Sequence, residues 1–143
     1  MSEFRLHPTL AADTLSVTTL ALSQVLLMND ERYPWLIIVP QRPALTELYQ
    51  LKSGDRQQLM RELDAASQVL HTQPLMSKIN VASLGNLVPQ LHVHVVGRHA
   101  ADPAWPGPVW GHSAPVPYAP GEGVERARRL GEEILGRLAK RDR

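Results

Sequence analysis

Polar and apolar residues alternate strictly between Pro89 and Val96, and this pattern constrains the fold more than any other part of the sequence. Gln90, His92 and His94 are separated by aliphatic residues, and residues two apart on a β-strand point to the same face. The alternation predicts a strand over 90–96, with its aliphatic side chains in a core and an amide and two imidazoles on the other face. A strand of this kind is typical of an antiparallel sheet with one packed face.

Two neighbouring imidazoles are an unusual choice for a solvated strand face, because imidazole titrates near neutral pH and needs hydrogen-bond partners. The spacing leaves three interpretations open: a surface strand, a functional histidine pair, or a His-x-His grip on a metal ion. A metal site would need a third ligand, and the sequence does not select one from His71, His99, His112 or a carboxylate.

The composition excludes several classes of protein. A chain of 143 residues is predicted to form a single domain, 1–143. A net charge of +1 argues against a nucleic-acid partner, because proteins that bind nucleic acid usually carry a basic excess. The lack of cysteine excludes disulfides and thiolate zinc sites. The longest near-apolar run, 35–40, is too short to cross a membrane, and the polar start has no signal-peptide core. We expect a cytoplasmic protein with no membrane partner.

Four strands and two long helices are predicted. The strands cover 21–28, 35–39, 78–83 and 90–96, and helical turns are expected within 44–51. Asp55 and Gln58 resemble a capping box, and apolar residues at helical spacing behind them predict a helix over 55–72 that ends before Pro74.

The C-terminal part of the chain is predicted to be a loop followed by a helix. Six of the twelve prolines lie within 103–120, which is incompatible with a regular helix. A helix over 121–140 is predicted because one face collects Val124, Ala127, Leu130, Ile134 and Leu138. The order β-β-α-β-β-α indicates an α+β domain with an antiparallel sheet and helices packed on one face.

The segment from Gln90 to Val96 resembles the signature of the histidine triad (HIT) family, His-x-His-x-His followed by two apolar residues. Other blocks that resemble the family occur in its order across residues 20–112: Asn29-Asp30, Val39-Pro40-Gln41-Arg42-Pro43, Asn80, Gly85-Asn86 and Trp105-Pro106. The resemblance implies a HIT-like fold, with an antiparallel sheet of about five strands and helices on one face.

The resemblance also implies a nucleophilic mechanism. His92 would attack the α-phosphorus of a nucleotide, and water or another acceptor would then resolve the nucleotidyl-imidazole intermediate. The main-chain carbonyl of Gln90 would hold the second ring nitrogen of His92, and His94 would contact the phosphate. The resemblance further implies a homodimer, no cofactor, no metal, and nucleotide contacts from Asn29, Asp30, Asn80, Asn86 and Arg42.

Two histidines of the family pattern are absent. The first triad position is Gln90, and the upstream histidine position is Trp35, counted back from Pro40. Because the family fold makes these positions neighbours, we interpret their loss as one coordinated change. Trp35 is either a core aromatic or a surface that stacks on the substrate or narrows the pocket. Trp105 and Trp110 are expected to cover the pocket or pack at a dimer contact.

The leading hypothesis is a nucleoside-phosphate hydrolase or nucleotidyltransferase. Its expected substrates are dinucleoside polyphosphates, nucleoside phosphoramidates or other nucleotidyl conjugates. The alternative is a nucleotide-binding protein whose turnover was lost with the two histidines. A metal-binding protein is a third possibility.

Overall fold

The structure, a computed structural model, describes residues 3–141. Its five strands form one antiparallel sheet in the order β1-β2-β3-β5-β4, so the predicted α+β architecture is confirmed. The elements along the chain are α1 (Pro8–Asp13), β1 (Thr14–Thr19), β2 (Ser23–Met28), β3 (Trp35–Pro40), the 3-10 turn η1 (Leu48–Gln50), α2 (Ser53–His71), β4 (Lys78–Ala82), β5 (Val93–Arg98) and α3 (Glu122–Arg141).

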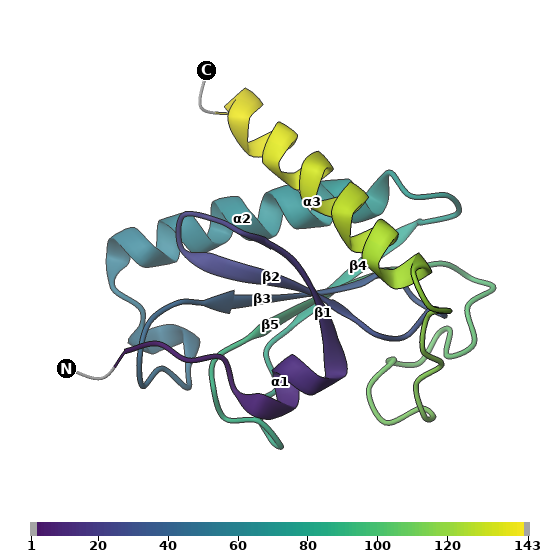
Figure 1. The fold of residues 1–143 in the computed structure, drawn as a ribbon, viewed down its shortest axis with the longest axis horizontal. Coiled ribbons are helices and arrows are strands. Elements are labelled where there is room, and N and C mark those ends of the chain that lie inside the picture. Colours follow the sequence, from purple (N-terminus) through teal and green to yellow (C-terminus); the bar gives the residue numbers. More distant parts are fainter. Residues whose placement is uncertain (1–2, 142–143) are drawn as a thin grey trace.

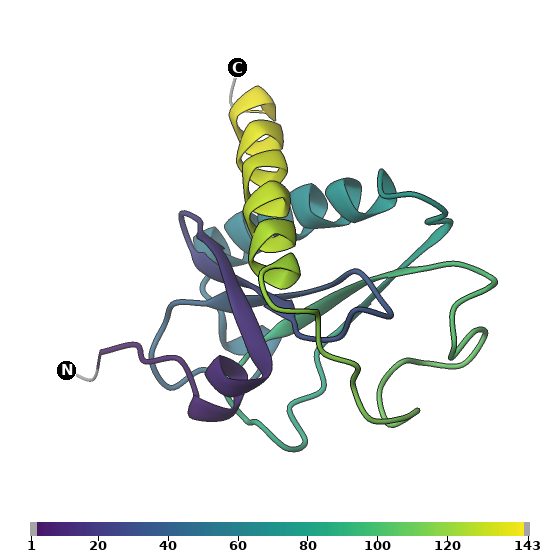
Figure 2. The same cartoon turned by 45° about the vertical axis from the view of Figure 1, so that its right-hand side comes forward.

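The two long helices cover one face of the sheet, and the short helix α1 lies on the other (Figures 1 and 2). Every residue of the central strand β3 is buried. Leu36 and Ile38 pack in the core beneath α2 and α3, while Trp35, Ile37 and Val39 pack in a second core on the opposite face. The prediction of helices on one face therefore holds for the long helices, and the second face is available for a site.

Helix α3 packs against β1 through glycine rather than through the residue that the sequence indicated. Val124 was expected on the buried face, but it is 64% exposed. Gly123 takes its place, and a Cβ there would collide with the side chain of Leu15. A Cβ on Gly131 would lie 3.2 Å from the carbonyl oxygen of Val17. The helix approaches the strand closely because these two positions lack side chains.

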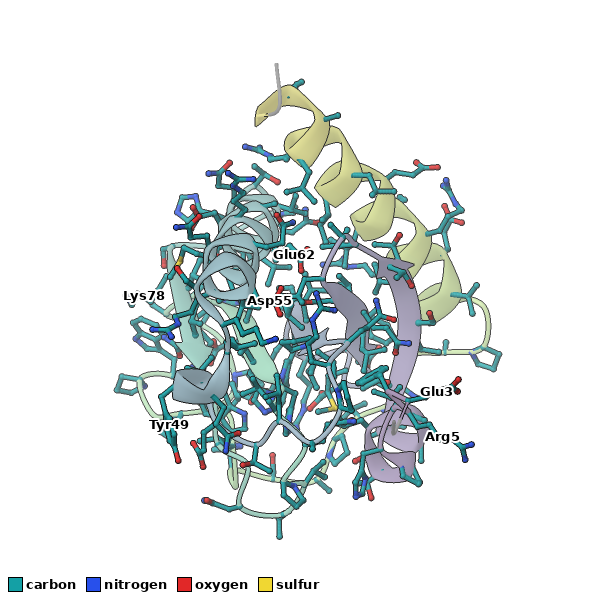
Figure 3. All side chains as sticks on the ribbon, turned by 90° about the vertical axis from the view of Figure 1, so that its left-hand side faces the viewer. Glu3, Arg5, Tyr49, Asp55, Glu62 and Lys78 are labelled. Carbon is teal, nitrogen blue, oxygen red and sulfur yellow. The ribbon has the colours of Figure 1, made fainter. Side chains whose placement is uncertain are left out.

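Several predicted boundaries were wrong. β5 begins at Val93 and not at residue 90. α2 begins at Ser53 without a side-chain cap, and Asp55 pairs with Arg42 instead of closing a capping box. Figure 3 shows Asp55 and Glu62 on α2, and it shows Glu3 and Arg5 beside α1. The elements α1 and β1 were not predicted.

No helix in the described part of the chain combines the length and the apolar character needed to span a membrane.

Candidate active site

A cavity of about 730 Å³ opens on the sheet face that carries α1, within the usual size range of small-molecule sites. His92 and His94 line it together with Trp35 and Ile37 of β3. The other walls come from α1, from the end of β2, from the loop 84–88 and from the proline-dense segment 103–120, called the Pro-rich loop below. Their lining residues include Thr9, Leu10, Ala12, Asp13, Asn29, Asp30, Asn86, Val109 and Trp110.

The ring of His92 is held by the main chain just before β5. Its Nδ1 lies 2.7 Å from the carbonyl oxygen of Gln90, the contact that the family resemblance implies. A carbonyl oxygen only accepts hydrogen bonds, so Nδ1 carries the hydrogen and Nε2 keeps a lone pair. The backbone is positioned here because the neighbouring Leu91 N–H donates to the Leu45 carbonyl at 2.9 Å. His92 thus has the protonation pattern of a nucleophile.

His94 lies beside His92, with ring centroids 4.9 Å apart. In the register of β3 and β5, Trp35 pairs with Val96 and Ile37 pairs with His94, so Trp35 and His94 are diagonal neighbours on one face. The indole Nε1–H of Trp35 donates to Nδ1 of His94 at 3.0 Å. Burial and, after it, the nearby His92 lower the pKa of His94 to about 4, so its ring is neutral at pH 7.

Trp35 and Trp110 enclose His94. The ring centroid of His94 lies 5.8 Å from that of Trp35 and 5.4 Å from that of Trp110. Trp35 lies in a hydrophobic core, as one of the two expectations had it, and it also lines the cavity. Trp110 also lines the cavity, whereas Trp105 does not and lies against the guanidinium of Arg98.

Asn29 and Asp30 line the cavity, but their oxygens are already hydrogen-bonded to other groups. The Asn29 side chain accepts from Tyr118 N–H at 3.0 Å, and the buried Asp30 carboxylate accepts from Arg32 and from Val116 N–H. Burial alone would raise the pKa of Asp30, but the hydrogen bonds from Arg32 and Val116 outweigh it and hold the pKa below its ordinary value. These contacts fix the end of the Pro-rich loop over the cavity.

The other nucleotide-binding candidates are dispersed. Asn86 lines the cavity, whereas Asn80 and Arg42 do not. The Asn80 side chain accepts from Arg98, whose guanidinium also pairs with Asp102 at 2.7 Å. Arg98 as a whole is only 1% exposed. This buried network anchors the start of the Pro-rich loop, so the structure gives Asn80 a role in holding that loop.

The side chain of Gln90 does not line the cavity, and it contacts the N-terminal segment instead. Its amide accepts from His7 N–H at 2.8 Å and donates to the Arg5 carbonyl at 2.7 Å. These bonds hold the segment that leads into α1. The sequence analysis missed this cavity wall, although Pro8 at the first helical position is a typical helix start.

The cavity has few charges. Among its lining residues, all within the described part of the chain, there is neither lysine nor arginine, and the carboxylates are those of Asp13 and Asp30. No group of three His, Asp or Glu side chains within residues 3–141 is arranged to hold a metal ion.

Comparison with known proteins identifies relatives across almost the whole chain. The sequence model described as HIT domain matches residues 10–101. Three solved structures of histidine triad proteins are similar to this chain. The protein from Bradyrhizobium japonicum is 37% identical over 96% of this chain and 99% of its own, with a TM-score of 0.85. The protein from Sinorhizobium meliloti 1021 is 40% identical over 94% of this chain and 96% of its own (TM-score 0.84), and that from Marinobacter aquaeolei VT8 is 42% identical over 97% and 98% (TM-score 0.85). A comparison of this chain with curated proteins found no significant match. These similarities confirm the HIT-like fold.

Proposed function

The chain belongs to the HIT domain family, and on this premise we propose that it is a nucleoside-phosphate hydrolase or nucleotidyltransferase that works through a nucleotidyl-histidine intermediate on His92. One observation carries the proposal. The hydrogen bond from His92 Nδ1 to the Gln90 carbonyl leaves Nε2 as a lone-pair nitrogen in a ring that lines the cavity. We place this activity in the cytoplasm, with no nucleic-acid or membrane partner.

The proposed reaction has two steps. In the first step, Nε2 of His92 attacks the α-phosphorus; a P–N bond forms, and the bond to the leaving group breaks with its electron pair going to that group. In the second step, a water oxygen attacks phosphorus and the P–N electron pair returns to Nε2. One hydrogen of the water stays on the released nucleotide, and the other reaches the leaving group. The Gln90 carbonyl stabilises the positive charge that develops on the imidazole.

The lining of the cavity supports a ranking of substrates. A polyphosphate chain carries several negative charges, and proteins usually hold such charges with arginine, lysine or a metal ion. The lining residues include neither lysine nor arginine. We therefore favour nucleoside phosphoramidates and other nucleotidyl conjugates with a small leaving group over dinucleoside polyphosphates.

The alternative, a nucleotide-binding protein without turnover, has an observation in its favour. Since the pKa of His94 is lowered to about 4, His94 is not a proton donor for a leaving group at pH 7. A leaving group that must be protonated by the protein would then stay attached. This protein would bind nucleoside monophosphate but release no product.

Mass spectrometry of the intact protein tests the proposal directly. The wild type is incubated with a nucleoside phosphoramidate and, separately, with a dinucleoside tetraphosphate, and the released mononucleotide is measured. We expect a nucleotidyl adduct and faster turnover of the phosphoramidate. The substitution His92→Ala removes the nucleophile and should abolish the adduct and lower kcat/KM by at least about 1,000-fold.

The matched control is His71→Ala, because His71 is exposed at the end of α2 and does not line the cavity. This variant should form the adduct as the wild type does. If the wild type gives neither adduct nor product while nucleoside monophosphate still binds, the enzyme proposal is wrong and the binding-protein alternative replaces it.

A further inference from the structure

We propose that Trp35 is a positioning residue that fixes the tautomer of His94. The indole Nε1–H of Trp35 lies 3.0 Å from Nδ1 of His94, and an indole nitrogen only donates hydrogen bonds. Nδ1 must therefore be the nitrogen without hydrogen, and the neutral ring carries its hydrogen on Nε2. The consequence for catalysis rests on the proposed function, but the tautomer itself does not.

The two histidines then have complementary tautomers. The Gln90 carbonyl holds the hydrogen of His92 on Nδ1, so its Nε2 is a lone-pair nitrogen. The Trp35 indole holds the hydrogen of His94 on Nε2, so this ring offers a donor. Both rings line the same cavity. One histidine can attack phosphorus while the other donates a hydrogen bond to a phosphoryl oxygen, where negative charge develops in the transition state.

Only one of the two indoles beside His94 makes this bond. Trp110 has its ring 5.4 Å from that of His94, slightly closer than Trp35, but its buried Nε1 has no hydrogen-bond partner. Aromatic packing alone would not distinguish the two tryptophans. The hydrogen bond from Trp35 is thus the specific contact that acts on the imidazole.

The same contact also opposes protonation of His94. A second proton would have to enter at Nδ1, where it would face the indole N–H, and a hydrogen bond made to the neutral form disfavours the charged form. Burial and the nearby His92 lower the pKa of His94 to about 4, and the indole contact acts in the same direction. His92 is the titratable group whose ring contacts His94. The carboxylates that line the same cavity belong to Asp13 and to Asp30, and Asp30 is paired with Arg32.

Tryptophan suits this task better than the histidine that the family pattern has at this position. A histidine donor changes its protonation near neutral pH, and it can also accept a hydrogen bond. The indole N–H does neither. A neutral imidazole held as a donor is an established catalytic device. We infer that the exchange replaces a titrating partner with a permanent donor.

Nitrogen-15 NMR tests the tautomer without reference to any activity. In the wild type, Nδ1 of His94 should show the shift of a bare nitrogen and Nε2 that of a protonated one, with a scalar coupling between Trp35 Nε1 and His94 Nδ1 across the hydrogen bond. The wild-type spectrum is sufficient even if variants fold poorly. A protonated Nδ1 in His94 would overturn the proposal.

The substitution Trp35→Phe removes the N–H and keeps an aromatic ring. We expect the two nitrogen shifts of His94 to converge as both tautomers become populated, and its titration midpoint to rise above about 4. The matched control Trp110→Phe removes the other indole and should leave both shifts unchanged. Equal changes in the two variants would mean that packing, and not the hydrogen bond, governs the ring.

Kinetics separate this role from the proposed function. In Trp35→Phe we expect kcat to fall by about tenfold, less than the ~100-fold or greater loss on removing an oxyanion donor, with little change in KM. An unchanged kcat despite mixed tautomers would refute the positioning role. An inactive wild type with the expected nitrogen shifts would refute the proposed function and leave the tautomer assignment intact.

Discussion

His92 and His94 are chemically identical side chains, yet their surroundings give them different properties. His92 donates to a carbonyl, whereas His94 accepts from an indole. Both are 5% exposed, so neither can exchange its partner for water at little cost. At the scale of single residues, the protein sets the roles of the two rings through the groups that meet their Nδ1 atoms.

The lowered pKa of His94 makes stability depend on pH. The unfolded chain takes up this proton near pH 6.5, whereas the folded chain does so only near pH 4. Between these values the unfolded state binds more protons, so stability is full above pH 6.5 and is lost as the pH falls. The expected loss of unfolding free energy for this group is about 3 kcal/mol, measurable by urea unfolding at several pH values.

A non-titrating substitution identifies the source of this loss. His94→Asn keeps an acceptor for the Trp35 N–H, and its unfolding free energy should fall less steeply between pH 6.5 and pH 4 than that of the wild type. The exposed His71→Asn should keep the wild-type slope. Parallel slopes in the wild type and His94→Asn would show that His94 is not the group responsible.

At the scale of elements, the cavity is built from segments that are distant in the sequence and are tied together by buried polar contacts. The Pro-rich loop is held at its start by Arg98 and Asp102 and near its end by Asp30. The α1 wall is held by the Gln90 amide. The segments that line the cavity are thus held in place by buried polar contacts.

The Gln90 amide is expected to act on binding and not on chemistry. Gln90→Ala removes two hydrogen bonds to the segment before α1 but keeps the main-chain carbonyl that holds His92. At about 1 kcal/mol for each of the two bonds, KM should rise by up to about 30-fold while kcat stays within about threefold. Steady-state kinetics on the best substrate measure both constants.

The control is Gln57→Ala, because Gln57 is exposed on α2 and remote from the cavity lining. It should change neither constant. A fall in kcat at constant KM in Gln90→Ala would assign the amide to the chemical step and remove its role as a clamp on the wall.

At the scale of the whole molecule, the two edges of the sheet differ. The edge at β1 is packed against α3 through Gly123 and Gly131. The edge at β4 ends the sheet on the other side, and Val81 on this strand is 50% exposed. An open edge strand is a template for pairing with another chain. We propose that β4 contributes to the homodimer that the family resemblance implies.

Light scattering measures this assembly. We expect the wild type to have about twice the chain mass of 15.9 kDa. A two-fold dimer that pairs the β4 edges receives the same residue from each copy. Val81→Arg therefore adds a positive charge to both sides of the contact and should shift the mass toward the monomer. The same change at an exposed valine of α3, Val124→Arg, should leave a dimer. A monomeric wild type at micromolar concentration would contradict the proposal.

The sequence alone determined the features that depend on local periodicity. Alternation placed His92, just before β5, and His94 on the same side of the chain with aliphatic residues behind them, and helical spacing located both long helices. The order of short motifs identified the family and the candidate nucleophile. The inferences on fold and family succeeded because strands and helices have fixed periods and because a motif preserves order along the chain, whereas the role of the candidate nucleophile stays a prediction.

Tertiary structure decided which distant residues meet, and local patterns carry no such information. Register placed Trp35 diagonal to His94, so an apparent core aromatic became the partner of a catalytic candidate. The tertiary structure also brings the Gln90 side chain to the N-terminal segment and the Asn80 side chain to Arg98. A hydrogen bond forms only between atoms that the whole fold brings within about 3 Å of each other, so these partners follow from strand pairing and loop packing rather than from spacing along the chain.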